Sequence, residues 1–132
     1  MKTIMWTNDL SVGSQVIDSE HKQLFDLIQK FYEGIKDNSP KERLEELILG
    51  LVNYTKTHFA NEEKYMRSLN YPGIDAHIKL HENFVEQVNG YYDRLKSGKL
   101  ILSLEVTNFL KDWLIKHIKG ADQQYAAFSS QQ

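Results

Sequence analysis

Two pairs of metal-binding residue types stand in the middle of the chain, each pair four residues apart. His58 and Glu62 form the first pair, and His77 and His81 form the second. Because four residues advance an α-helix by about 400°, each pair projects from one helical face. The turn signal Tyr71-Pro72-Gly73 separates the pairs, so we expect the two helices to fold back on each other. Two histidine-containing pairs held face to face have the geometry of a metal site.

The spacing of apolar residues predicts four helices that would position these pairs. Asp18 is the expected N-cap of the first helix, and Ser39-Pro40-Lys41-Glu42 reads as a capping box that starts the second. Gly98 and Gly120 are expected to end the third and fourth helices. The expected helices are 19–37, about 40–68, 74–96 and 102–119. We therefore expect one domain, residues 1–132, made of an N-terminal arm (1–17), a four-helix bundle (18–122) and a C-terminal tail (123–132) in which Tyr125 and Phe128 can dock.

Short connections between four helices predict an all-α fold, an up-down-up-down antiparallel four-helix bundle. In that topology the start of the first helix, the end of the second, the start of the third and the end of the fourth share one end of the molecule. All five histidines fall at that end, because His21 lies near the first start and His117 near the last end. Both histidines also lie in phase with the apolar stripes of their helices, so their side chains should point inward.

A single histidine in such a helix is more often a surface or hydrogen-bonded core residue than a ligand, and the same caution applies to the acids. Glu63 reads as a solvated helix charge, and Asp122 alone would read as a surface residue. Five inward histidines are different, since each buried imidazole without a partner costs about 1–3 kcal/mol. Asp122 follows His117 by five residues, a spacing that does not repeat on one α-helical face. We expect Gly120 to let the chain leave the helix and return the carboxylate to the metal.

The complete pattern resembles the hemerythrin family, in its single-domain bacterial form. The resemblance rests on His21, His58-x-x-x-Glu62, His77-x-x-x-His81 and His117-x-x-x-x-Asp122, and on the surrounding segments VGSQVIDSEHKQLF and FLKDWLIKHIKGADQQY. It spans nearly the whole chain, and no ligand position departs from the family pattern.

The resemblance implies a cofactor of two non-haem iron ions with an oxo or hydroxo bridge. It assigns His77, His81 and His117 to one iron, His21 and His58 to the other, and Glu62 and Asp122 to both. One coordination position then stays open on the iron with two histidines, where O2 would bind reversibly. The family pocket positions that would enclose this ligand are Leu24, Phe59, Trp113, Leu114 and Ile118.

The type of ligand favours binding over catalysis, so we do not expect an enzyme. Carboxylate-rich diiron bundles carry Glu-x-x-His motifs, and no glutamate lies three residues before any histidine here. A nitrogen-rich site favours ferrous iron, which suits oxygen storage, transport or delivery. Two alternatives stay open: an oxygen or redox sensor that acts through a partner protein, and a diiron peroxidase or oxidase.

Composition limits the remaining classes. A formal net charge of −2 without a basic run argues against nucleic acid and against an anionic membrane surface. The chain has no cysteine, which excludes disulfides, zinc thiolates and iron–sulfur clusters. No stretch approaches the length of a membrane span. We expect a cytoplasmic monomer with O2 as its small-molecule ligand and an unidentified recipient or signalling protein.

Overall fold

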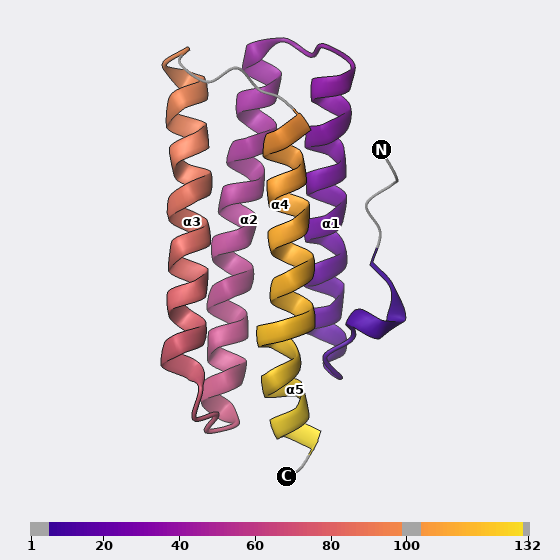
Figure 1. The fold of residues 1–132 in the computed structure, drawn as a ribbon, viewed down its shortest axis with the longest axis vertical. Coiled ribbons are helices and arrows are strands. Elements are labelled where there is room, and N and C mark those ends of the chain that lie inside the picture. The colour runs from indigo at the N-terminus through magenta and orange to yellow at the C-terminus, as the bar shows by residue number, and fades with distance from the viewer. Residues whose placement is uncertain (1–5, 99–103, 131–132) are drawn as a thin grey trace.

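The computed structural model describes residues 6–98 and 104–130, and this part of the chain is almost entirely helical (Figure 1). It contains no β-strand among the described residues, and the predicted four-helix bundle is confirmed. The helices are α1 (Gln15–Lys36), α2 (Lys41–Ser68), α3 (Ile74–Lys96), α4 (Leu104–His117) and α5 (Gln123–Ser130), with a 3-10 turn η1 (Asn8–Leu10) and a π-helical turn η2 (Ile118–Asp122).

The helices α1 to α4 run antiparallel to their sequence neighbours (Figure 1). The start of α1, the end of α2, the start of α3 and the end of α4 lie together at the lower end of the view. The arm lies beside the lower half of α1, and α5 extends below α4. The histidine-bearing segments of four separate helices are therefore brought to one end of the bundle.

Left-handed residues close the helices at the turns. Asn38 follows α1 with φ 54°, Asn70 follows α2 with φ 55°, and Gly98 follows α3 with φ 78°. After α2, the amides of Tyr71 and Asn70 donate to the carbonyls of Met66 and Arg67 at 3.1 Å, which satisfies the last turn of the helix. Gly98 ends α3 as predicted, and α3 itself has the predicted limits.

The start of α1 differs from the prediction. The helix begins at Gln15 and its N-cap is Ser14, whose side chain accepts a hydrogen bond from the Ile17 amide. Asp18 instead accepts hydrogen bonds from the Val12 amide (2.9 Å) and the Ser11 hydroxyl. Asp18 therefore secures the arm against α1 and does not cap the helix, and the arm ends earlier than residue 17.

The predicted capping box before α2 is not formed. Pro40 occupies the N-cap position, and no side chain makes a capping hydrogen bond there. The carbonyl of Pro40 accepts from the amides of Arg43 and Leu44 at 3.0 and 3.1 Å, so the helix starts on backbone bonds. The predicted start of α4 near residue 102 lies outside the described residues.

Two apolar clusters enclose the histidine end of the bundle. The main core runs along the four helices and contains Phe25, Ile28, Leu51 and Leu110, all at most 2% exposed. A smaller cluster at the lower end consists of Val12, Ile17, Met66 and Tyr125. The histidines contact both clusters, because Phe59 of the main core stacks on His81 and the Tyr125 ring of the smaller cluster lies 5.6 Å from the His77 ring. No helix within the described part of the chain is both long and apolar enough to cross a membrane.

Candidate metal centre

Five histidines and two carboxylates from four helices and the π-turn converge between the two apolar clusters. Their ligand atoms form two groups that could each hold a metal ion, and both groups contain Glu62. Every member is at most 7% exposed, and both carboxylates are fully buried. The larger group is His77, His81, His117, Glu62 and Asp122, and the smaller is His21, His58 and Glu62.

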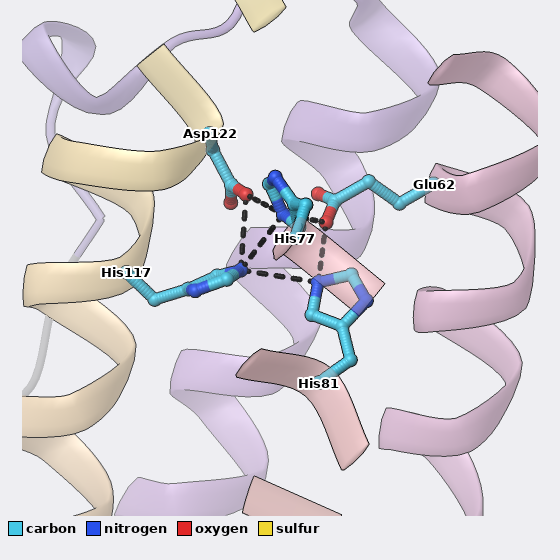
Figure 2. Close-up of side chains that lie close together, drawn as sticks. All are labelled: Glu62, His77, His81, His117 and Asp122. Atoms are coloured by element: carbon cyan, nitrogen blue, oxygen red, sulfur yellow. Dashed lines mark hydrogen bonds and ion pairs between the residues drawn. The ribbon is translucent and has the colours of Figure 1, made fainter. Parts of the chain in front are cut away.

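The larger group is drawn in Figure 2, where three imidazole rings point toward a common centre. The Nε2 atom of His117 lies 3.1 Å from Nε2 of both His77 and His81. Glu62 Oε1 lies 2.9 Å from His81 Nε2 and 3.2 Å from His77 Nε2. Three nitrogens and a carboxylate oxygen thus face one another within contact distance.

Glu62 divides its two oxygens between the groups. Oε1 faces His77 and His81, whereas Oε2 lies 3.3 Å from His21 Nε2 and 3.5 Å from His58 Nε2. The hydroxyl of Tyr125 also donates a hydrogen bond to Oε2 at 2.9 Å. This is the arrangement of a carboxylate placed to bridge two metal positions.

Asp122 divides its oxygens in the same way. Oδ1 lies 2.9 Å from His77 Nε2 and 3.1 Å from His117 Nε2, whereas Oδ2 lies 3.3 Å from His21 Nε2. The structure therefore places two carboxylates side by side between a group of three histidines and a group of two.

A π-helical turn, not an end of the helix, brings Asp122 into the site. The backbone stays helical through Gly120, which corrects the expected exit of the chain there. In a π-turn the hydrogen bonds run from i to i+5. The five-residue spacing of His117 and Asp122 therefore falls on one face, and the helix resumes as α5 immediately afterwards.

The donor set fits a metal and is poorly satisfied without one. Glu62 Oε1 and both oxygens of Asp122 are buried and lie close to histidine nitrogens without forming a hydrogen bond of good geometry, and the buried Nδ1 of His21 has no hydrogen-bond partner among the described residues. The Nε2 atoms of His77, His81 and His117 face each other, and two such nitrogens share at most one proton between them. A cation at these positions would satisfy the lone pairs of the nitrogens and the carboxylates together.

The pKa values in the metal-free protein reflect this crowding. Burial lowers the pKa of His21 and His77, but contacts with Asp122 and Glu62 outweigh burial and raise each to about 9. Burial favours neutral Glu62 and Asp122, yet the facing histidines hold the pKa of both carboxyls well below their usual range. Burial lowers the pKa of His117 despite its contact with Asp122. The carboxylates are therefore ionised, and protons occupy part of the space that a metal would take.

Two further carboxylates and a tyrosine contact this set, and their positions in the sequence did not predict such a role. Glu63, expected to be a solvated charge, accepts a hydrogen bond from Nδ1 of His81 at 2.9 Å, so that expectation is wrong. Glu20 accepts from Nδ1 of His58 at 2.8 Å. Tyr125 was expected only to dock the tail. The only feature of the sequence that could have indicated these contacts is that Glu20 and Glu63 are the chain neighbours of His21 and Glu62.

The residues expected to form the ligand pocket lie in the main core or against it. Leu24, Phe59, Leu114 and Ile118 belong to the main core, and Trp113 packs against it. The Phe59 ring stacks on His81 with centroids 3.7 Å apart, and Trp113 stacks on His117 at 4.5 Å. These two aromatic rings therefore cover two of the three histidines in the larger group.

These features define a class: a four-helix bundle with a histidine-rich metal centre that bridging carboxylates can divide into two positions. A family model described as "Hemerythrin HHE cation binding domain" matches residues 12–128. The chain is 35% identical to a bacteriohemerythrin of Stenotrophomonas maltophilia, over 96% of this chain and 81% of that protein. It is 37% identical to a myohemerythrin of Theromyzon tessulatum, over 91% of this chain and 88% of that protein.

The fold agrees with a solved structure as well. The crystal structure of a wild-type hemerythrin superposes with a TM-score of 0.90, at 24% identity, over 98% of this chain and 99% of that chain. The chain belongs to the hemerythrin family, whose cofactor is a diiron centre.

Proposed function

We propose that the protein binds O2 reversibly at a diiron centre and serves in oxygen storage, transport or delivery. The observation that supports this most strongly is the division of Glu62 and Asp122 between two groups of histidines. A site for one metal has no need of two carboxylates that each face two sets of nitrogens. The hemerythrin names of the relatives support the same function.

The distances support a ligand assignment as part of this proposal. His77, His81 and His117 would hold one iron, with Glu62 Oε1 and Asp122 Oδ1. The second iron would receive Glu62 Oε2, Asp122 Oδ2 and two histidines, His21 and His58. The second position has one protein ligand fewer than the first. When bound, the irons supply reversible coordination of O2 at the position that the protein leaves open.

The surrounding residues would protect that position from water. Leu24, Leu114 and Ile118 are at most 3% exposed and belong to the main core, and we infer that they form an apolar wall for the open position. An apolar wall disfavours entry of ions and protons, which are expensive to bring into a low-dielectric interior. The Tyr125 hydroxyl would hold Glu62 Oε2 in orientation without adding a charge.

The experiment that tests this function is a cycle of aeration and deaeration. The iron-loaded protein, reduced anaerobically, should change its visible spectrum on exposure to O2 and recover the reduced spectrum when O2 is removed. Irreversible bleaching, or consumption of an added reductant with turnover, would favour a diiron oxidase or peroxidase. A spectrum that changes with redox state but not with O2 would favour a redox sensor acting through a partner.

A further inference from the structure

Two carboxylates outside the proposed ligand set hold two of the histidines by their outer ring nitrogens. Nδ1 of His58 donates to Glu20 Oε1 at 2.8 Å, and Nδ1 of His81 donates to Glu63 Oε2 at 2.9 Å. We call Glu20 and Glu63 the outer carboxylates. An imidazole whose Nδ1–H is held in this way keeps its lone pair on Nε2. In both histidines Nε2 is the atom that faces the metal position.

The outer carboxylates connect neighbouring helices. Glu20 of α1 reaches His58 of α2, and Glu63 of α2 reaches His81 of α3. Each is one position away from a residue that points into the site, His21 or Glu62. Because one residue turns the helix by about 100°, the inner residue faces the metal position while the outer carboxylate faces the next helix. No carboxylate among residues 6–98 and 104–130 holds the Nδ1 of His21 or of His117, the histidine of α4.

We propose that Glu20 and Glu63 are positioning residues that set the Nδ1–H tautomer of His58 and His81 before metal arrives. One outer carboxylate serves each group of histidines, so each metal position has one nitrogen ligand already oriented. Helices α1, α2 and α3 thus share the two oriented nitrogens, and α4 with its π-turn adds His117 and Asp122 to the site. This inference rests on the metal centre of the proposed function and not on O2 binding.

The surroundings of the two outer carboxylates predict different consequences of their loss. Glu20 is fixed a second time by the Asn61 amide, which donates to its Oε2 at 2.7 Å. Glu63 borders an open groove of about 700 Å³ between α2 and α3, which Phe59 and His81 also line. The position served by Glu20 has only two histidines, so losing one oriented nitrogen there matters more. Without Glu20, iron should leave the position of His21 and His58 first.

The test compares iron release from the full-length, iron-loaded, reduced protein to an excess of chelator under anaerobic conditions. Glu20→Leu and Glu63→Leu remove the hydrogen-bond acceptor, whereas Glu20→Gln and Glu63→Gln keep an acceptor oxygen. The control is Glu86→Leu, which replaces an exposed acid on the same groove as Glu63. We expect release to be about 10–100-fold faster in the leucine variants. The glutamine variants should fall between these and the wild type, and Glu86→Leu should match the wild type. Glu20→Leu should pass through a form with one iron per chain.

The second readout is the tautomer itself, from ¹⁵N spectra of the histidine side chains in the metal-free protein, at a pH that keeps the imidazoles neutral. The wild type should show Nδ1–H at His58 and His81, and each leucine variant should lose this preference at its own histidine only. If a leucine variant does not fold, the glutamine variant at the same position tests the inference. It should show a mixture of the two tautomers at its histidine and release iron faster than the wild type. If all variants of Glu20 and Glu63 keep the wild-type tautomers and the wild-type rates of iron release, the inference is overturned. Neither readout involves O2, so failure of O2 binding and failure of the outer carboxylates are distinguishable.

Discussion

Individual side chains around the two metal positions separate into those that face the metals and those that limit access to them. We propose that Leu114 belongs to the second kind, since it is 3% exposed and lies three residues, about one turn, before His117. It makes no polar contact, so its replacement changes the wall of the pocket and leaves the ligands in place. Leu110, four residues earlier on α4 and fully buried, offers a matched site farther from the ligands.

Leu114→Ala should therefore shorten the lifetime of the oxygenated protein several-fold while iron stays near two per chain, because the cavity admits water beside the site. Both Leu114→Ala and the control Leu110→Ala should lower stability by about 2–5 kcal/mol. The decay of the visible spectrum after aeration measures the lifetime. An equal lifetime in the two variants would mean that Leu114 does not guard the open position.

At this scale the sequence predicted the residues that converge but not those that support them. His58/Glu62 and His77/His81 follow directly from helical spacing, and the bundle topology adds His21 and His117. Glu20 and Glu63 could not be recognised, because each acts on a histidine 38 or 18 residues away, across a helix interface. An exposed-looking charge on one helix becomes a hydrogen-bond acceptor only when the neighbouring helix is placed.

Among the elements, the π-turn has the greatest effect on the site. An α-helix continued past His117 would carry residue 122 off the inward face, and the i to i+5 turn returns it. Helical spacing alone cannot reveal such a turn, which is why a helix end at Gly120 was expected. The limits of α3 were predictable because Gly98 takes a left-handed conformation that favours glycine. The start of α1 was not predictable, because the Asp18 carboxylate accepts hydrogen bonds from donors in the arm instead of capping the helix.

Gly120→Ala tests whether the chain stays helical through residue 120 or leaves the helix there. Gly120 lies within the helical turn without a positive φ, and an added Cβ would meet no atom within 4 Å. We expect unchanged iron content and a gain in stability of up to about 1 kcal/mol. Gly98→Ala, at φ 78°, should instead lose about 1–2 kcal/mol. Thermal unfolding and iron analysis are the measurements, and loss of iron in Gly120→Ala would restore the account in which glycine lets the chain leave the helix.

For the molecule as a whole, the metal centre joins α1, α2, α3 and the end of α4, so metal should stabilise the entire bundle. The iron-loaded protein should melt at a higher temperature than the metal-free protein, with a difference that grows with the concentration of free Fe²⁺ under anaerobic conditions. Scanning calorimetry at two metal concentrations checks this. Equal melting temperatures would show that the convergent histidines do not bind metal in the folded state.

The metal-free protein should also lose stability as pH rises. His21 and His77 have pKa values of about 9 in the folded chain, against 6.5 in the unfolded chain. Between these values the folded state binds more protons, so the free energy of unfolding falls with increasing pH. The stabilisation from protonated His21 and His77 is therefore complete below about pH 6.5 and is lost as the pH rises through 9. Metal binding displaces these protons, so metal affinity should rise over the same range. Denaturant unfolding at several pH values measures the first effect, and a metal-free stability that rises from pH 6.5 to 9 would contradict the assigned contacts.

We infer that the two shared carboxylates, Glu62 and Asp122, divide the site into two metal positions. Iron analysis of protein loaded with Fe²⁺ anaerobically and freed of unbound metal tests this claim most directly. We predict two irons per chain in the wild type, and a marked loss in His77→Ala, which removes a nitrogen of the larger group. Saturation at one metal per chain would contradict the account, because Glu62 and Asp122 would then have no second position to bridge.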